Sequence, residues 1–342
     1  MRRTSVALAR RPAAAWRAAA AGPAARAGAA VVALALAAVW PFWIQNVYYH
    51  TVALLALIYV LLGLGMNVLM GHAGLVHAGY AAFWGVGAYV VAIFSTKFGL
   101  SFWMALPVSV VGAAVLAVLV GIPAIRVSGL YFVLVTLGFG AIFELAMTNW
   151  DYVGGPNGLY GIDPPQLGSV PLQTPRQLYW LVLAVTALSV LVMHRVANSR
   201  VGRAWNYLRE DEVAAQAFGV NPVWSKLQAA VLGAAWAGLA GAFFAVRQTA
   251  VAPSSFTFLE SFVVILIVSL GGLRSLPGTV VGTVAMIVLP ELLRPLAQYR
   301  FLVFGAAIVL MMLFRPEGLW PGRARRHEEI AREWLGSRGR SA

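Results

Sequence analysis

A long stretch without charge constrains the fold of this chain more than any other feature. From Ala27 to Thr96 the sequence contains no Asp, Glu, Lys or Arg. One helical membrane crossing needs about 20 apolar residues, so this stretch has room for about three crossings. The 342 residues are 61% hydrophobic and only 11% charged. Water-soluble domains do not bury such an apolar excess, which excludes a soluble enzyme, a disordered protein and a nucleic-acid binder.

Further low-charge segments predict an all-α integral membrane protein with about ten transmembrane helices. A Gly-rich break at 71–74 separates the second span from the third, and one re-entrant segment would reduce the number to eight or nine. Small residues such as Gly233, Gly238 and Gly241 should allow close packing between spans. The expected spans are 29–45, 51–70, 76–96, 102–124, 129–149, 177–193, 227–247, 255–273, 275–293 and 300–318.

The basic residues predict an orientation. Lys and Arg number 25 against 12 acids, a net charge of +13, and in membrane proteins such an excess collects in cytoplasmic loops. We place the Arg-rich tail 1–28 in the cytoplasm. The 194–226 loop and the tail 321–342 then fall on the same side, so both termini are cytoplasmic and 29–320 is the transmembrane domain. The chain has no cysteine, so it can form no disulfide or thiolate metal site.

The 194–226 loop contains residues typical of the start and the end of a short helix. Acids at 210–212 suit the start of a helix because its dipole is positive there. Gly219 suits the left-handed position just past a helix end, and Asn221-Pro222 is typical of the start of the next helix. One face of this helix is apolar. It could bind in a groove of a peripheral protein or lie on lipid headgroups, and the three acids favour the protein. That face consists of Ala214, Ala215 and Phe218.

Six blocks of sequence, in order, carry a family resemblance. They are Met66-Asn67 with 81–89, then 129–140, 149–159, 202–221, 271–291 and 313–319. Together these blocks resemble the branched-chain amino acid permeases of ABC importers, the LivM type. The pattern Ala214-Ala215, three residues, Gly219 is similar to the loop with which such permeases contact their ATPases.

The resemblance implies a multi-pass permease subunit in the bacterial cytoplasmic (inner) membrane. It would pair with a second, related permease, two cytoplasmic ABC ATPases and a periplasmic solute-binding protein. Neither lysine, Lys97 or Lys226, stands in a Gly-x-x-x-x-Gly-Lys-Ser/Thr loop, so we expect the partner subunits to bind ATP and this chain to hold no cofactor. The expected ATPase-coupling residues are Arg209, Glu210, Asp211, Glu212, Ala214, Ala215, Phe218 and Gly219.

Polar residues inside predicted spans are candidates for a translocation path. Asn67, His72 and His77 surround the backbone break, and transporters use such breaks to place free backbone groups near the membrane midplane. Contacts between helices would explain the same residues equally well. The two His are five residues apart with no carboxylate or Cys nearby, so we expect no metal site. The path candidates are Asn67, His72, His77, Tyr80, Thr136 and Glu144.

The loop Gly155-Pro156-Asn157-Gly158 consists of turn-forming pairs. It is either a plain outer hairpin or a surface for the binding protein, and the resemblance favours the second. The predicted function is import of branched-chain or related amino acids or small polar amide-like solutes, driven by ATP. The alternative is an ion-coupled secondary transporter of a small polar solute, in which Glu144 would be the buried carboxylate. A membrane-embedded enzyme has no supporting pair of His and acid, serine elbow or metal cluster.

Overall fold

The computed structural model describes residues 46–127, 129–167 and 170–292, and beyond these only 35, 37–41, 43, 305, 309, 313 and 318–320. The chain divides into two units, Met1–Asn46 and Val47–Ala342. In the first unit, residues 35, 37–41 and 43 are helical. The predicted spans 29–45 and 300–318 and both predicted tails lie mostly or entirely outside the described residues.

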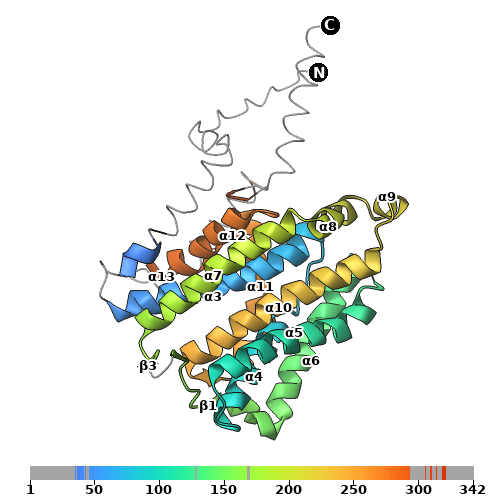
Figure 1. Cartoon of the computed structure of the whole chain (residues 1–342). Coiled ribbons are helices and arrows are strands. Elements are labelled where there is room, and N and C mark those ends of the chain that lie inside the picture. The colour runs from blue at the N-terminus through green and yellow to red at the C-terminus, as the bar shows by residue number, and fades with distance from the viewer. Residues whose placement is uncertain are drawn as a thin grey trace. The chain divides into compact units, whose positions relative to one another are not determined.

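Apolar helices make up most of the second unit (Figure 1). In the described part of the chain, six helical segments are long and apolar enough to cross a membrane, and two shorter apolar helices accompany them. The chain is therefore a predominantly helical multi-pass membrane protein, as predicted. The six long segments contain α3 (Val47–Met66), α5 (Phe102–Ala124), α6 (Leu130–Asn149), α7 (Pro175–Ala197), α10 (Pro222–Gln248) and α11 (Phe258–Gly271), and α4 (Tyr80–Thr96) is one of the shorter helices.

Several spans differ in their boundaries from the prediction, three of them in a way that bears on the site. The third span was expected to begin at residue 76, but α4 begins at Tyr80 because 73–79 is a non-helical segment. The second span is longer than expected, since α3 continues into the π-helix η1 (Asn67–His72). The predicted span 275–293 consists of three short pieces, α12 (Leu276–Thr283), the π-helix η5 (Val284–Val288) and α13 (Leu289–Leu292).

The connections between the helices of this unit lie alternately at two ends. One end, called here the α9 end, holds α8 (Arg200–Glu210), α9 (Glu212–Ala217) and the α11–α12 turn, which are joined by an ion pair between Glu210 and Arg274. The α5–α6 turn lies there too, since Gly121 near the end of α5 packs against Leu227 near the start of α10. Figure 1 shows α8 and α9 at the upper right and β1 and β3 at the opposite end.

The other end, called here the β end, is tied together by short extended segments. β1 (Leu159–Tyr160) pairs antiparallel with β4 (Ala250–Val251), with Leu159 opposite Val251. This pairing joins the α6–α7 connection to the α10–α11 connection. β2 (Gln166–Leu167) pairs with β3 (Val170–Pro171) in a second ladder. Single 3₁₀ turns complete this end: η2 (Asp151–Val153), η3 (Gly155–Asn157) and η4 (Pro253–Ser255).

Glycines let α10 pack closely against three other helices. A methyl group on Gly87 of α4 would lie 2.2 Å from the carbonyl oxygen of Gly238, and one on Gly65 of α3 would lie 2.6 Å from that of Gly233. Gly238 also faces the backbone of α5 at Ser109. Lipid is as apolar as these side chains, so close van der Waals contact is what holds helices together. The predicted role of the small residues in packing is confirmed here.

The helices differ in how much they are covered. α3 and α10 are mostly buried, whereas most residues of α5 and α6 are exposed or only partly buried. Aromatic rings fill the space between α3, α4 and α10, with Trp84 4.7 Å from Phe244 and 5.8 Å from Tyr59 between ring centroids. α10 and α3 are therefore the centre of the unit, and α6 is a peripheral helix.

Candidate functional site

The break after α3 begins as a change in helix type. In η1 the hydrogen bonds span five residues instead of four, and the backbone N–H of Ala73 donates to the carbonyl of Val68. η1 ends at His72, and the chain then turns at Gly74. The φ of Gly74 is +74°, a conformation that glycine adopts readily and other residues rarely do. π-helical segments of this kind often lie at functional sites. The sequence located the break, and the structure adds its π-helical form.

Asn67 joins this broken helix to the α11–α12 turn. Its Nδ2 donates to Thr279 Oγ1 at 2.7 Å and to the carbonyl oxygen of Ser275 at 3.2 Å. Its Oδ1 accepts from the backbone N–H of Arg274 at 3.1 Å. The side chain is buried, so all of its hydrogen-bonding groups are satisfied within the protein. Asn67 thus fixes the position of a turn that lies more than 200 residues away in sequence.

The end of η1 contacts α8 in the predicted coupling loop. Nδ1 of the buried His72 lies 3.1 Å from Oδ1 of Asn206. The guanidinium of Arg209 donates to the carbonyl oxygen of Gly71. Arg209 also packs over Gly74, where a methyl group would lie 2.9 Å from its Cγ. The coupling loop and the helix break are therefore in direct contact.

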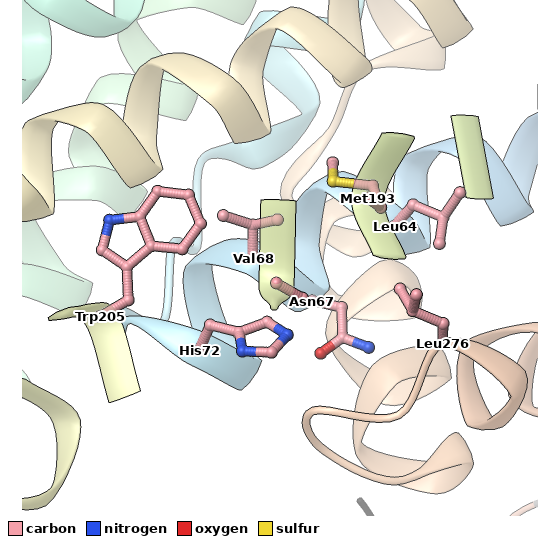
Figure 2. A pocket seen from close by; sticks show the side chains of 8 residues that line it. Leu64, Asn67, Val68, His72, Met193, Trp205 and Leu276 are labelled. Carbon is pink, nitrogen blue, oxygen red and sulfur yellow. The ribbon is translucent and has the colours of Figure 1, made fainter. Parts of the chain in front are cut away.

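A small cavity of about 10 Å³ lies at this junction. It has room for about one water molecule, so it is not a solute-sized passage. Figure 2 shows Asn67 and His72 from η1 beside Trp205 of α8 and Leu276 of α12. The remaining residues around it are Leu64, Val68, Met193 and Ala197.

The other path candidates lie in a second group around the non-helical segment 73–79. The backbone N–H of Ala78 donates to Thr136 Oγ1 of α6 at 3.1 Å. His77 is buried among aromatic rings, 4.9 Å from Phe83 between centroids. The Tyr80 hydroxyl lies 2.9 Å from the carbonyl oxygen of Gly233. These three candidates hold the 73–79 segment against α6 and α10.

Glu144 lies apart from both groups. It is eight residues beyond Thr136 on α6, about 12 Å along the axis at 1.5 Å per residue. Its side chain is half-buried. The structure therefore divides the six candidates into three locations and does not bring them into one binding site. Among the described residues, no three His, Asp or Glu side chains gather as metal ligands.

The predicted short helix in the coupling loop is α9, with the start and end that its residues indicated. Asp211 caps it, accepting from the backbone N–H groups of Val213 and Ala214 at 2.8 and 3.0 Å. Gly219 follows the helix with φ of +82°, and Asn221 caps α10. One detail differs: Glu210 is the last residue of α8 and not the first of α9, because the preceding segment is itself helical.

The outward side of α9 is apolar. Val213 is 77% exposed and Phe218 87%, and Trp224 on the first turn of α10 is 61% exposed. Ala215 is buried on the side of α9 that faces the protein, while Ala214 is exposed. Ion pairs join the flanks of the helix to the rest of the unit, Glu212 with Lys226 at 2.7 Å and Glu210 with Arg274 at 2.9 Å. We call Val213, Ala214, Phe218 and Trp224 the α9 surface.

The predicted binding-protein loop lies at the β end. Gly155, Pro156 and Asn157 form η3, and Gly155 is buried while Pro156 and Asn157 are exposed. Gly158 has φ of +79°, and a methyl group there would lie 2.0 Å from the carbonyl oxygen of Val251. The loop is therefore packed against the α10–α11 connection and presents two exposed residues.

Three structural residues were missed by the sequence prediction. Arg274 was not among the predicted site residues, although it pairs with Glu210. Glu260 and Tyr59 were not predicted as site residues either, but Oε2 of Glu260 accepts from the hydroxyl of Tyr59 at 2.5 Å. Nothing in the apolar run around Tyr59 indicates a partner 201 residues away. For Arg274 the available signal was a single cation in a tight hairpin between two spans.

The described residues define a multi-pass helical membrane protein in which α3 ends in a π-helix and a non-helical segment, 73–79, precedes α4; π-helical irregularities of this kind often lie at functional sites. A family model described as branched-chain amino acid transport system, permease component, matches residues 48–314. The chain therefore belongs to the branched-chain amino acid permease family, as its sequence motifs predicted.

Individual relatives agree with this assignment. The chain is 39% identical over 315 residues to the high-affinity branched-chain amino acid transport system permease protein LivM of Escherichia coli (strain K12), covering 85% of this chain and 74% of the relative. It is 38% identical to LivM of Salmonella typhimurium over 84% of this chain and 73% of the relative. LivH of Salmonella typhimurium is 24% identical over 76% of this chain and 90% of its own length. No solved structure matches the chain.

Proposed function

We propose that this chain is the membrane-spanning permease subunit of an ATP-driven importer of branched-chain or related amino acids in the bacterial cytoplasmic membrane. Its partners would be a second, related permease, two cytoplasmic ABC ATPases and a periplasmic solute-binding protein. The relatives named LivM and LivH, which both resemble this chain, support pairing of two related permeases. ATP would bind to the ATPases, and this chain would provide the path and the coupling surface.

The observation that carries the proposal is the α9 surface. An exposed Phe at 87% and an exposed Val at 77% on one short helix are costly in water. The helix stands between two spans and is anchored by ion pairs on both flanks. A short helix with an apolar face fits a hydrophobic groove on a partner protein. An ATPase docked there would act on a helix next to α8, which contacts η1 through Asn206 and Arg209.

The charge distribution supports a cytoplasmic position for the α9 end. In membrane proteins, Lys and Arg concentrate on the cytoplasmic side. The β end carries Lys97, Arg176 and Arg247. The α9 end carries the larger set: Arg126, Arg195, Arg200, Arg203, Arg209, Lys226 and Arg274. The exposed Pro156 and Asn157 then face the periplasm, where a solute-binding protein would dock.

Reconstitution tests the proposal. The complete complex, with the binding protein outside and ATP on the ATPase side, should take radiolabelled leucine into proteoliposomes. We expect no uptake without ATP, or with ATPases whose P-loop lysine is replaced, because the chain itself has no ATP site. Ionophores that collapse proton and sodium gradients should leave the rate nearly unchanged.

The same assay separates the ion-coupled alternative. Uptake by this chain alone, abolished by the ionophores and independent of ATP, would refute an ABC importer and support gradient coupling through Glu144. If the complex does not take up leucine but takes up another small polar solute with ATP, the chain is still an importer subunit and only the proposed substrate is wrong.

A further inference from the structure

The α8 segment contacts the broken helix and the α11–α12 turn through three separate polar contacts. Arg209 bonds to the carbonyl of Gly71, and Asn206 lies beside His72. Glu210 pairs with Arg274 in the turn. All three residues lie on the last two turns of α8, immediately before α9. Only Asp211, which caps α9, separates α8 from α9, so a displacement of α9 would pass to α8 and from there to the break and the turn.

Arg274 is held at both its backbone and its side chain. Its φ of +63° lies in the left-handed region, which side-chain-bearing residues rarely adopt. The backbone N–H donates to Asn67 Oδ1 at 3.1 Å, and both terminal guanidinium nitrogens donate to the same oxygen of Glu210 at 3.0 and 2.9 Å. The Arg274 side chain is only 12% exposed, whereas that of Glu210 is 57% exposed. The exposed acid thus neutralises a mostly buried cation.

Space around this network is restricted. A methyl group on Gly71 would lie 1.9 Å from Asn67 Oδ1 and 3.0 Å from the backbone N of Arg274. Asn67 also bonds to Ser275 and Thr279 on the far side of the turn. The Asn67 side chain therefore joins η1 to the turn through both its oxygen and its nitrogen, so neither η1 nor the turn can move far without the other.

The hydrogen-bond pattern of η1 differs from that of an α-helix by one residue. Hydrogen bonds that span five residues can change to the four-residue pattern of an α-helix, which shifts the register of the segment. Packed elements generally respond to a small displacement by switching between such discrete arrangements. η1 is thus an element that can change state when α8 and the turn pull on it.

We propose that Glu210, Arg274 and Asn67 are positioning residues that transmit movement of the ATPase-docked α9 to the broken helix. This proposal rests on the proposed function, because it requires an ATPase at the α9 surface. Arg274 is the central member, since it links the acid of the coupling loop to the amide of η1. The role of the network is to couple ATP hydrolysis to opening of the translocation path.

Charge reversal tests the proposal in the complete reconstituted complex. Arg274→Glu and Glu210→Arg should each lower leucine uptake about tenfold or more, which is within the usual range of coupling effects. ATP hydrolysis should continue, so the ATP consumed per leucine rises. The double variant, with the charges exchanged, should recover uptake to within about threefold of the wild type because the ion pair forms again.

Three measurements make the outcome decisive. Co-purification of the ATPases should be unchanged in every variant, because the α9 surface is intact. Loss of co-purification would mean that Glu210 contacts the ATPase directly, which would overturn the positioning role while leaving the proposed function standing. Arg200→Gln, which removes an exposed cation at the opposite end of α8, is the matched control and should transport normally.

Uptake near the wild-type level in both single reversals, or no recovery in the exchanged pair, would also overturn the proposal. If a reversal prevents folding, Glu210→Gln gives a milder test, since it removes the charge and keeps the shape. It should lower leucine uptake while the ATPases remain bound. Normal uptake with normal ATP consumption in Glu210→Gln would refute the network.

Discussion

A Phe218→Asp permease should insert and fold but lose nearly all ATP-driven uptake. Phe218 is 87% exposed on α9, so the folded chain by itself gains little from this ring. A docked ATPase would bury it, and burying a carboxylate there instead would be unfavourable. Central apolar contacts of an interface are commonly worth about 2–4 kcal/mol. The affinity for the ATPases should therefore fall by a factor of roughly 30 to 1000.

Two measurements check this result, ATPase co-purification and leucine uptake in proteoliposomes. Phe98→Asp is the matched control, because Phe98 is also an exposed phenylalanine but follows α4 at the β end. It should retain its ATPases. Full uptake by the Phe218→Asp complex would contradict the assignment of α9 as the docking helix.

Gly87→Ala should destabilise the folded permease strongly for so small a change. The added methyl group would lie 2.2 Å from the carbonyl oxygen of Gly238, and its next neighbours are also backbone atoms of Gly238. Backbone atoms cannot rotate away as a side chain can, so α4 and α10 must separate. Overpacking a well-packed contact typically costs about 1–3 kcal/mol, and a larger residue such as Leu should prevent folding altogether.

The comparison for this prediction is Gly138→Ala on α6. A methyl group at Gly138 meets no atom within 4 Å, and Ala favours a helix over Gly by roughly 0.5–1 kcal/mol. Thermal unfolding followed by fluorescence size-exclusion should give a lower midpoint for Gly87→Ala and an unchanged or higher one for Gly138→Ala. Equal midpoints in the two variants would show that the close contact of α4 with α10 contributes nothing.

Most helix positions within the described region were predictable from the scarcity of charge. Residues 102–124 coincide with α5, and 129–149 differ from α6 by one residue. A span in lipid must satisfy its backbone internally and carries little charge, so runs with at most one Asp, Glu, Lys or Arg identify these helices. The start of α4 was missed because the segment 73–79 is as uncharged as the helix that follows it.

The coupling loop was predictable where its residues have strong preferences for the end or the start of a helix. Gly219 and Asn221-Pro222 mark the end of α9 and the start of α10 by their conformational preferences. α8 was missed because charged residues interrupt its apolar ones. Its buried Trp205 and Leu208 are three residues apart, which is the helical spacing that could have revealed it.

The arrangement of the path candidates was not predictable. The path candidates Asn67, His72 and Thr136 are buried polar residues, but their hydrogen-bond partners lie 58 to 212 residues away in the sequence. Spacing along one helix gives no information about which distant helix it packs against. The contacts of Asn67 with the α11–α12 turn, and hence the role of Arg274, required the three-dimensional structure.

A single introduced cysteine gives the most direct test that α9 receives the ATPase. The natural sequence has no cysteine, so a maleimide-benzophenone label can be attached at one chosen position. In the assembled complex, illumination of labelled Phe218→Cys should give a covalent product with an ATPase subunit, and labelled Asn157→Cys at the β end should give none. An ATPase product from Asn157→Cys, or its absence from Phe218→Cys in a complex that retains its ATPases, would contradict the docking of the ATPase on α9.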